Sequence, residues 1–372
     1  MKVTVVGGGI IGCATAYELA KAGCAVTLFE RATPGGEASN AAAGMLVPLG
    51  DATGSAFERL AIASWRLYPD VVEELRSRTG VDVEYVTRGS IYPLFDAEDV
   101  RRAEARIAGR EMREFGIEAW DTADVRAREP ALATRVRGAM FIGADHWVNN
   151  QRLVVAYAQA AVAAGVILRA GTSVSRVIVE DGRTHGVVAD GDRCEADAVL
   201  LAAGAWTAAL AASFGARLRV EPARGQMVAL AHVPAVLHHA VHTDDVYLVP
   251  RPSGELLIGA TVERVGFQRA VTAEGISSLL AAAIGLVPSL GSLPIARTWY
   301  GFRPWAPDGL PILGPWPDVE GLWVATAHFR NGILLAPITA RLMTEWMMSG
   351  IPALRVEEFA PQRFLSRDRS TF

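Results

Sequence analysis

Three glycines and one acid near the start of the sequence have the types and spacing of a phosphate-binding motif. Gly7, Gly9 and Gly12 follow the apolar, β-branched run at residues 3–6, and small residues with helical spacing come next. The first glycine permits a sharp turn, the second a close approach of backbone to a pyrophosphate, and the third close packing of helix on strand. A second apolar strand ends on Glu30, whose carboxylate would accept hydrogen bonds from ribose hydroxyls. The pattern predicts a dinucleotide-binding unit rather than a glycine-rich turn.

A loop of small residues follows this motif at residues 34–48. Its side chains are too small to build a core, but they would let the backbone approach a flat ligand closely. Ser39 and the free N–H groups of the loop could donate hydrogen bonds to such a ligand. The position of the loop beside the glycine motif favours this interpretation over a flexible linker.

The remaining patterns predict an α/β protein with two kinds of sheet. We expect helices over residues 55–79 (interrupted before Pro69), 97–115, 152–164 and about 333–349, the last with Pro337 in its first turn. Buried strands at residues 25–30, 166–168 and 198–203 indicate a Rossmann-like nucleotide-binding domain, discontinuous over residues 1–85, 148–215 and 304–372. Strands at residues 220–230, 246–261 and 299–303 indicate an α+β substrate domain with an antiparallel sheet, over residues 86–147 and 216–303. In the hairpin at residues 246–261, Tyr247, Val249 and Arg251 share one face.

Composition excludes several classes of function. The chain has 372 residues, of which 51% are hydrophobic and 20% charged, and a net charge of −4 without a basic block, so nucleic acid is not an expected partner. Only Lys2 and Lys21 are lysines, and neither is placed for Schiff-base chemistry. Cys13, Cys24 and Cys194 form no disulfide framework, and no metal-ligand spacing is present. Without a leader or a membrane-length apolar run, we expect a cytoplasmic protein.

Four further stretches carry a family resemblance: SNAAAGM at residues 39–45, GFRP at 301–304, DGLPILG at 308–314 and AHFRNGILLAP at 327–337. Together with the glycine motif, they resemble the flavin-dependent amine oxidoreductases of the D-amino-acid oxidase family, nearly end to end. Within that family the sequence is most similar to the glycine oxidases of thiamine biosynthesis. The arginine-asparagine-glycine stretch is far more specific than the glycine motif.

The resemblance implies an FAD cofactor held in a Rossmann-like domain of the glutathione-reductase type. A small amino acid or amine would lose its α-hydrogen as hydride to flavin N5, and oxygen would then reoxidise the flavin and form hydrogen peroxide. The imine product would be hydrolysed to a 2-oxo acid or captured for thiazole synthesis. Family members with covalent flavin use a later cysteine, which is absent here, so we expect FAD to be bound non-covalently. The residues expected to contact FAD are Gly7, Gly9, Ile10, Ile11, Gly12, Glu30, Arg31, Ala38, Ser39, Ala43, Gly44, Met45, Val174, His328, Arg330, Asn331, Gly332, Ile333 and Leu334.

The resemblance also implies roles at the substrate. Arg303 would bind the substrate carboxylate, whose two oxygens match the planar guanidinium, and the Tyr247 hydroxyl would join the same carboxylate. Arg330 would place its backbone carbonyl near the substrate amine. The helix beginning near Ile333 would point its positive end at the flavin. The alternatives are an ion-paired surface arginine, a core tyrosine and a plain core helix.

Two positions depart from the glycine oxidase pattern: Asp245 replaces a histidine, and Val262 replaces a methionine. They leave the substrate preference among glycine, sarcosine and small D-amino acids open. Two other functions remain open: a D-amino-acid dehydrogenase that passes electrons to a quinone or carrier, and a non-catalytic flavin-binding subunit. The oligomeric state also remains open, and a homo-oligomer is compatible with the sequence. A nicotinamide-dependent dehydrogenase would leave residues 39–45 and 328–334 unexplained.

Overall fold

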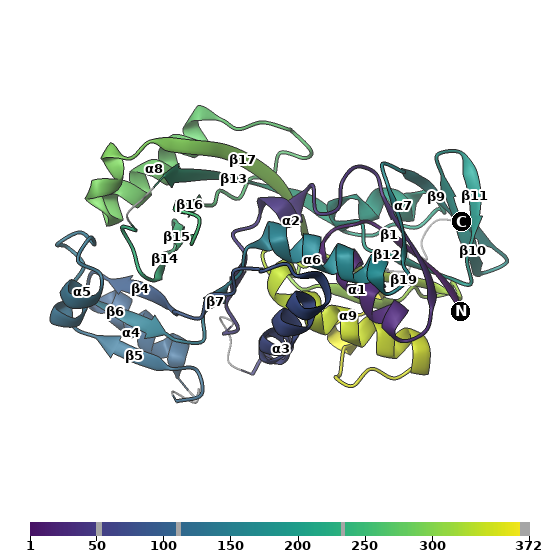
Figure 1. Ribbon diagram of the computed structural model, residues 1–372, viewed down its shortest axis with the longest axis horizontal. Helices are drawn as coiled ribbons and strands as arrows, with labels where there is room; N and C mark the ends of the chain where they lie inside the picture. The colour runs from purple at the N-terminus through teal and green to yellow at the C-terminus, as the bar shows by residue number, and fades with distance from the viewer. Residues whose placement is uncertain (50–53, 109–112, 232–234, 365–372) are drawn as a thin grey trace, which may run out of the picture.

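The computed structural model describes residues 1–49, 54–108, 113–231 and 235–364, and it has two parts that lie side by side (Figure 1). In the part on the right of Figure 1, the described residues form a sheet with the strand order β18-β19-β12-β1-β2-β8. All its neighbouring strands pair in parallel except β18 and β19, which are antiparallel. Its strands are β1 (Lys2–Val6), β2 (Ala25–Glu30), β8 (Ile167–Ala170), β12 (Ala198–Leu201), β18 (Ile312–Pro315) and β19 (Leu322–Thr326).

Helices and a ribbon cover the two faces of this parallel sheet. One core packs against a helical layer of α1 (Ile10–Lys21), α3 (Ala56–Thr79), α6 (Asn150–Ala163) and α9 (Gly332–Ser349). The other face contributes to a separate core with α7 (Thr207–Ala212) and the antiparallel ribbon of β9 (Val174–Glu180), β10 (Arg183–Ala189) and β11 (Asp192–Glu195). Burial on both faces explains why the central strands β1, β12 and β19 are mostly apolar.

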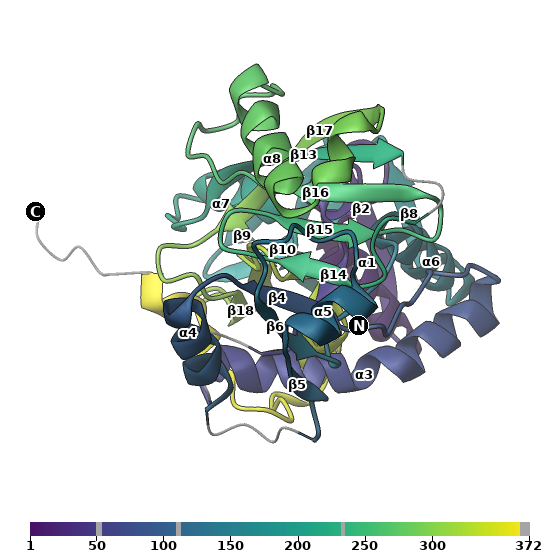
Figure 2. The same cartoon turned by 90° about the vertical axis from the view of Figure 1, so that its left-hand side faces the viewer.

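The second sheet has the order β17-β13-β16-β15-β14-β4-β6-β5 among the described residues, and Figure 2 looks onto it with β17 at the top and β5 at the bottom. Its strands are antiparallel apart from the β14–β4 pair. They are β4 (Ser90–Leu94), β5 (Ile117–Trp120), β6 (Gly138–Ile142), β13 (Glu221–Ala231), β14 (Ala240–His242), β15 (Tyr247–Pro250), β16 (Glu255–Gly259) and β17 (Ile295–Trp305). The helices of this part are α4 (Ala97–Ile107), α5 (Thr122–Arg128) and α8 (Ala273–Leu286).

The predicted α/β class with a parallel and a mainly antiparallel sheet is therefore confirmed, whereas the domain boundaries stay a prediction. Helix α4 ends at Ile107, and residues 109–112 of the predicted helix at 97–115 lie outside the described residues. Short elements connect the two parts: α2 (Ala38–Ala41), β3 (Met45–Leu46) and β7 (His146–Trp147). No helix in the described part of the chain has both the length and the hydropathy of a membrane span.

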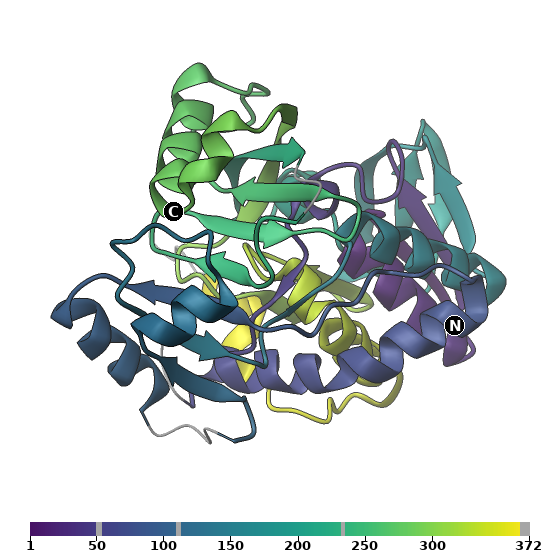
Figure 3. The same ribbon diagram turned by 60° about the vertical axis from the view of Figure 1, so that its left-hand side comes forward.

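The prediction of a break before Pro69 is wrong, because α3 runs uninterrupted through this residue. Proline inside a helix costs about 3 kcal/mol since it removes one N–H group and crowds the preceding turn. Both ends of α3 are capped: the Ser55 hydroxyl accepts from the N–H of Glu58 at 3.1 Å, and Gly80 ends the helix in the left-handed region with φ 72°. Packing against α9, visible in Figure 3, further offsets the cost of the proline.

The prediction for Pro337 is also wrong in its position. Helix α9 begins at Gly332, so Pro337 lies in the second turn rather than the first. The missing N–H leaves the carbonyl of Ile333 without its helical partner, and the buried Tyr68 hydroxyl of α3 donates to that carbonyl instead. One residue further on, the Ser64 hydroxyl donates to the carbonyl of Leu334 at 2.6 Å and accepts from the N–H of Ile338 at 3.3 Å. Hydroxyl groups of α3 thus bond the backbone groups that lack helical partners in the first turns of α9.

Removing either hydroxyl should destabilise the protein. In Tyr68→Phe or Ser64→Ala, a buried carbonyl of α9 loses its donor, and we expect the free energy of unfolding to fall by about 1–3 kcal/mol. Urea unfolding followed by tryptophan fluorescence measures this change. Ser277→Ala is the matched control, because the Ser277 hydroxyl bonds the carbonyl of Ala273 on the exposed side of α8, and its loss should change stability by less than about 0.5 kcal/mol. Equal stability of all three variants would contradict a stabilising role of the Tyr68 and Ser64 hydroxyls.

Candidate functional site

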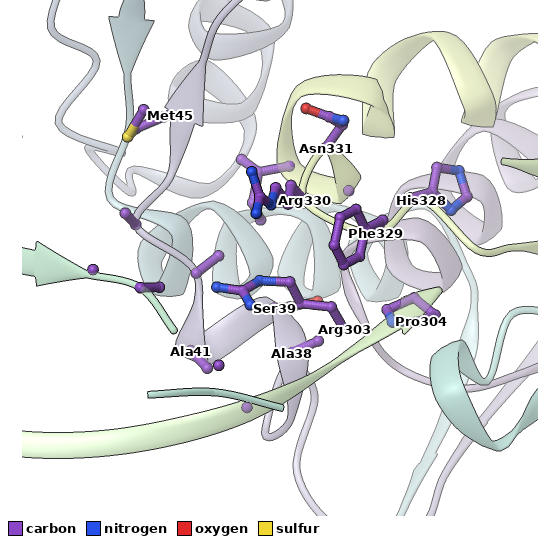
Figure 4. A pocket seen from close by; sticks show the side chains of 18 of the residues that line it. Ala38, Ser39, Ala41, Met45, Arg303, Pro304, His328, Phe329, Arg330 and Asn331 are labelled. Carbon is purple, nitrogen blue, oxygen red and sulfur yellow. The ribbon is translucent and has the colours of Figure 1, made fainter. Parts of the chain in front are cut away.

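A cavity of about 1800 Å³ lies between the two sheets. The turns after β1, β12 and β19 reach it from the parallel sheet, and β15, β16 and β17 reach it from the antiparallel sheet. Ligands of open α/β sheets bind at this carboxyl edge of the parallel strands. Figure 4 shows Arg303, Arg330 and Met45 entering the cavity from three separate segments.

The N-terminus of α1 opens onto the cavity through the glycine motif. A Cβ on Gly12 would lie 1.8 Å from the carbonyl oxygen of Gly7, so only glycine permits this close approach of helix to strand. The N–H of Ile10 donates to the Ser39 hydroxyl at 3.0 Å, which ties the small-residue loop to the helix. The next N–H groups of the first turn have no intrahelical partner, so they are available to an anion.

Glu30, at the end of β2, is fixed by backbone donors. Its carboxylate accepts from the N–H of Gly8 at 2.8 Å and from the N–H of Ala32 at 2.9 Å. Arg31 pairs with Glu37, and its guanidinium lies 3.8 Å from the ring centre of Trp206. This corner of the cavity therefore combines a carboxylate held in place with an aromatic wall.

The loop at residues 38–45 lines the cavity with its backbone. Gly44 has φ 73°, and a Cβ there would lie 2.1 Å from the carbonyl oxygen of Val148. The carbonyl of Gly44 accepts from the N–H of Val148 at 2.9 Å. Within the described residues, the N–H groups of Ala43 and Gly44 donate to no protein oxygen. These donors are free for a ligand.

The turn into α9 forms the opposite wall. Ala327 and Phe329 have φ values of 59° and 49°, so the chain between β19 and α9 passes twice through the left-handed region. The side chain of the capping residue Asn331 makes no bond to the helix, and the first N–H groups of α9 face the cavity unpaired. Their partial positive charge would favour an anionic ligand group.

His328 in this turn is buried and stays neutral. Burial lowers the pKa of its imidazole from 6.5 to about 3, and its Nε2 lies 3.1 Å from the Thr339 hydroxyl. The side chain therefore supports the turn against α9 without adding charge to the cavity.

Arg303 and Tyr247 meet at the other end of the cavity. Arg303 lies directly over Gly225, where a Cβ would be 2.2 Å from Nη1, and Nη1 donates to the carbonyl of Thr261 at 2.9 Å. The Tyr247 hydroxyl lies 3.2 Å from Sδ of Met227. Burial lowers the pKa of Arg303 and raises the pKa of Tyr247.

Arg330 lies close enough to affect both groups: its positive charge adds to the lowering of the pKa of Arg303 and opposes the rise in the pKa of Tyr247. Figure 4 shows the guanidinium groups of Arg303 and Arg330 in the same region of the cavity. Neither arginine has a carboxylate within ion-pair distance among residues 1–49, 54–108, 113–231 and 235–364. Their charge is therefore available to a substrate anion.

A polar network that sequence reasoning missed stands behind Arg303. The Thr261 hydroxyl donates to Glu263 at 2.5 Å, and the buried guanidinium of Arg224 binds the same carboxylate through two nitrogens. Gln226 donates to Glu263 at 2.7 Å. These residues fix the segment whose carbonyl orients Arg303. Only the arrangement of strands around β13 reveals them, because nothing in their sequence spacing marks a site.

Of the residues expected at the cofactor and substrate, all but two line the cavity. Gly12 and Leu334 lie behind it, where they shape the first turns of α1 and α9. Of the two departures from the family pattern, the exposed Asp245 lines the cavity, whereas Val262 does not. The described residues contain no group of three or more acidic, histidine or cysteine side chains that could hold a metal ion.

Comparison with known proteins gives a consistent result. The model of the family described as FAD dependent oxidoreductase matches residues 2–346. Glycine oxidase of Geobacillus kaustophilus is 38% identical over 374 residues, covering 98% of this chain and 97% of that protein. The crystal structure of glycine oxidase from the same organism superimposes with a TM-score of 0.92 at 36% identity, covering 97% and 98% of the two chains.

A third relative is longer than this chain. The bifunctional protein ThiO/ThiG of Synechocystis is 37% identical, and the match covers 98% of this chain but 54% of that protein. With a family model matched over nearly its whole length and relatives of this identity, the chain belongs to the family of FAD-dependent oxidoreductases.

Proposed function

We propose that this FAD-dependent oxidoreductase is an oxidase of glycine and related small amines, such as sarcosine and small D-amino acids, with oxygen as electron acceptor. The observation that carries the proposal is the pair of Arg303 and Tyr247 at the inner end of the cavity, with no protein carboxylate to neutralise the arginine among the described residues. An unpaired guanidinium beside a tyrosine hydroxyl matches the carboxylate of a small amino acid. The similarity to glycine oxidase supports the same substrate class.

The residues present fit FAD. The unpaired N–H groups of α1 suit a pyrophosphate, and Glu30, held at the end of β2, suits ribose hydroxyls. Free N–H groups of Ala43 and Gly44 and the N-terminus of α9 lie farther along the same cavity, where they suit the flavin ring. The described lining of the cavity includes no cysteine, which supports non-covalent binding.

The chain's own residues would bind and orient the substrate rather than remove its protons. When bound, FAD would supply the two-electron acceptor for the α-hydrogen of the substrate. Arg303 and Tyr247 would hold the carboxylate, and the backbone carbonyl of Arg330 would accept from the neutral amine. Because a neutral amine loses hydride without a strong base, a neutral His328 is compatible with this chemistry.

A place in thiamine biosynthesis is part of the proposal. The product would be the imine of the amino acid, which water converts to a 2-oxo acid or a thiazole-forming enzyme captures. The similarity to bifunctional ThiO/ThiG proteins supports this role.

The decisive experiment is anaerobic reduction of the holoprotein by glycine, followed at the visible flavin band. We expect bleaching, then recovery with peroxide formation when air is admitted. Arg303→Met should weaken glycine binding about 10- to 150-fold, which corresponds to about 1.5–3 kcal/mol for a charged hydrogen-bonding group. Arg219→Met is the control because Arg219 is exposed, and it should behave as the unmodified protein.

The other outcomes decide between substrates and acceptors. Bleaching by sarcosine or D-alanine but not glycine would move the substrate preference within the proposed class. Bleaching that air does not reverse quickly would contradict the oxidase and favour a dehydrogenase. A yellow protein that none of these amines bleaches would overturn the proposed substrate class.

Gly225→Ala tests the placement of Arg303 without touching its charge. The new methyl group would lie 2.2 Å from Nη1 and 2.5 Å from Cζ, so the guanidinium must move. We expect KM for glycine to rise at least about tenfold, since a displaced guanidinium loses its two-pronged contact, while the spectrum of bound flavin stays unchanged. In Gly291→Ala, the control, the nearest atoms would be 3.8 Å away and KM should not change. An unchanged KM in Gly225→Ala would contradict a carboxylate site above this glycine.

A further inference from the structure

The carbonyl groups of the small-residue loop are held from the side away from the cavity. Asn150 donates through Nδ2 to the carbonyls of Ser39 at 2.7 Å and Asn40 at 3.0 Å, and Trp299 donates through Nε1 to the carbonyl of Ala41 at 3.1 Å. Neither side chain lines the cavity, whereas the loop does. The donors therefore lie behind the loop, on two different elements, α6 and β17.

Arg251 completes this set at the far end of the loop. Its Nη2 donates to the carbonyl of Ala43 at 2.7 Å and to Oδ1 of Asn150 at 3.1 Å, and its Nη1 donates to the carbonyl of Val148 at 2.5 Å. Like the other two side chains, it does not line the cavity. Asn150 and Arg251 are thus bonded to each other as well as to the loop.

The orientation of these carbonyls fixes the direction of the adjacent N–H groups. In a trans peptide the C=O and the following N–H point in opposite directions. With the carbonyls of Ala41 and Ala43 turned away from the cavity, the N–H groups of Ala42 and Gly44 are turned toward it. Neither N–H donates to a protein oxygen within the described chain.

Packing alone does not explain why a charged residue is buried at position 251. The side chain is 7% exposed and has no carboxylate within ion-pair distance among the described residues. Burial lowers its pKa from 12.5 to about 10, so it stays charged at neutral pH, with Glu84, Glu255 and Arg297 as the nearest charged groups that influence it. A buried charge without an ionic partner is costly, and an apolar side chain of similar volume would pack there at lower cost. The position of the loop carbonyls explains why a guanidinium is present.

We propose that Arg251, Asn150 and Trp299 form a carbonyl clamp, that is, a set of side-chain donors that hold the carbonyls of the loop at residues 38–45 and so fix its backbone in the orientation that binds the flavin. Arg251 is the central positioning residue of this clamp. The clamp presents the N–H groups of Ala42 and Gly44 toward the space that the ring would fill. The inference rests on the proposed FAD site and not on the identity of the substrate.

Two substitutions separate the clamp from simple packing. Arg251→Met keeps the volume and removes the donors, and Asn150→Asp keeps the shape and the acceptor for Arg251 but removes both donors to the loop. We expect each to raise the Kd for FAD at least about tenfold, the effect of losing one or two buried hydrogen bonds. The measurement is the fluorescence of FAD released on serial dilution of the holoprotein. Arg251→Lys, which restores a charged donor, should recover part of the affinity.

Stability gives the second readout. With FAD at the same multiple of its Kd for each protein, the thermal unfolding midpoint of Arg251→Met should stay close to that of the unmodified protein, because removal of a buried charge without an ionic partner offsets the loss of the donors to the carbonyls of Ala43 and Val148. Arg152→Met is the control, since Arg152 lies two residues from Asn150 on α6 but is exposed and pairs with Glu84. Its affinity for FAD should change by less than about twofold.

The outcomes are separable from those of the substrate test, because FAD release is measured without any amine. Arg251→Met and Asn150→Asp proteins that retain FAD as tightly as the control would overturn the clamp, even if glycine is oxidised. A lower unfolding midpoint that accounts for the whole loss of affinity would also overturn it and leave a packing role. Weakened FAD binding with intact stability would support the clamp, even in a protein that glycine does not reduce.

Discussion

Backbone N–H groups without protein partners are the feature on which this site depends. They come from the first turn of α1, from the loop at residues 38–45 and from the first turn of α9. Such donors bind acceptors well only if they are already in position and if no protein oxygen competes for them. Most of the long-range polar contacts around the cavity serve one of these two conditions.

The contacts come from far along the chain. Tyr68 of α3 donates to the carbonyl of Ile333 that Pro337 leaves unpaired, and Ser64 bridges the carbonyl of Leu334 and the N–H of Ile338. Asn150 and Arg251 donate to the carbonyls of the loop. In each case a side chain satisfies an acceptor on the outer side of the backbone, so the donors on the inner side remain free. Glu30 shows the reverse arrangement, because its side-chain carboxylate accepts from the N–H groups of Gly8 and Ala32 and is fixed before any ligand binds.

The sequence predicted the local parts of this arrangement and missed the distant ones. The strand, the glycine turn and Glu30 could be read because their partners lie within thirty residues and each glycine has a defined steric reason. Arg251 was placed correctly on the face of Tyr247 and Val249, but its partners Ala43 and Val148 are 208 and 103 residues away. The alternation of side chains along a strand indicates which face a residue lies on. It does not indicate which carbonyl, distant in sequence, will accept a hydrogen bond from that residue.

The predictions for Pro69 and Pro337 were wrong for a related reason. Helix propensity correctly assigns a cost to Pro69 and Pro337, but the compensation comes from hydroxyls and packing on a neighbouring helix. The family resemblance identified the residues expected at the substrate, because Arg303 and Arg330 lie in short contiguous stretches that can be recognised in the sequence. The network of Arg224, Gln226 and Glu263 behind them is spread over β13 and the segment after β16, so no short stretch marks it.

The order of strands in the parallel sheet has a consequence for biosynthesis. β1 is made long before its neighbour β12, which ends at Leu201, and before the next strand, β19, which ends at Thr326. Helix α1 packs against α9, which is completed only at Ser349. During synthesis α6 can cover part of α1, but the contact with α9 and the complete FAD site form only after α9 has been made. The order of strands therefore favours binding of FAD after these late elements have folded rather than early in synthesis.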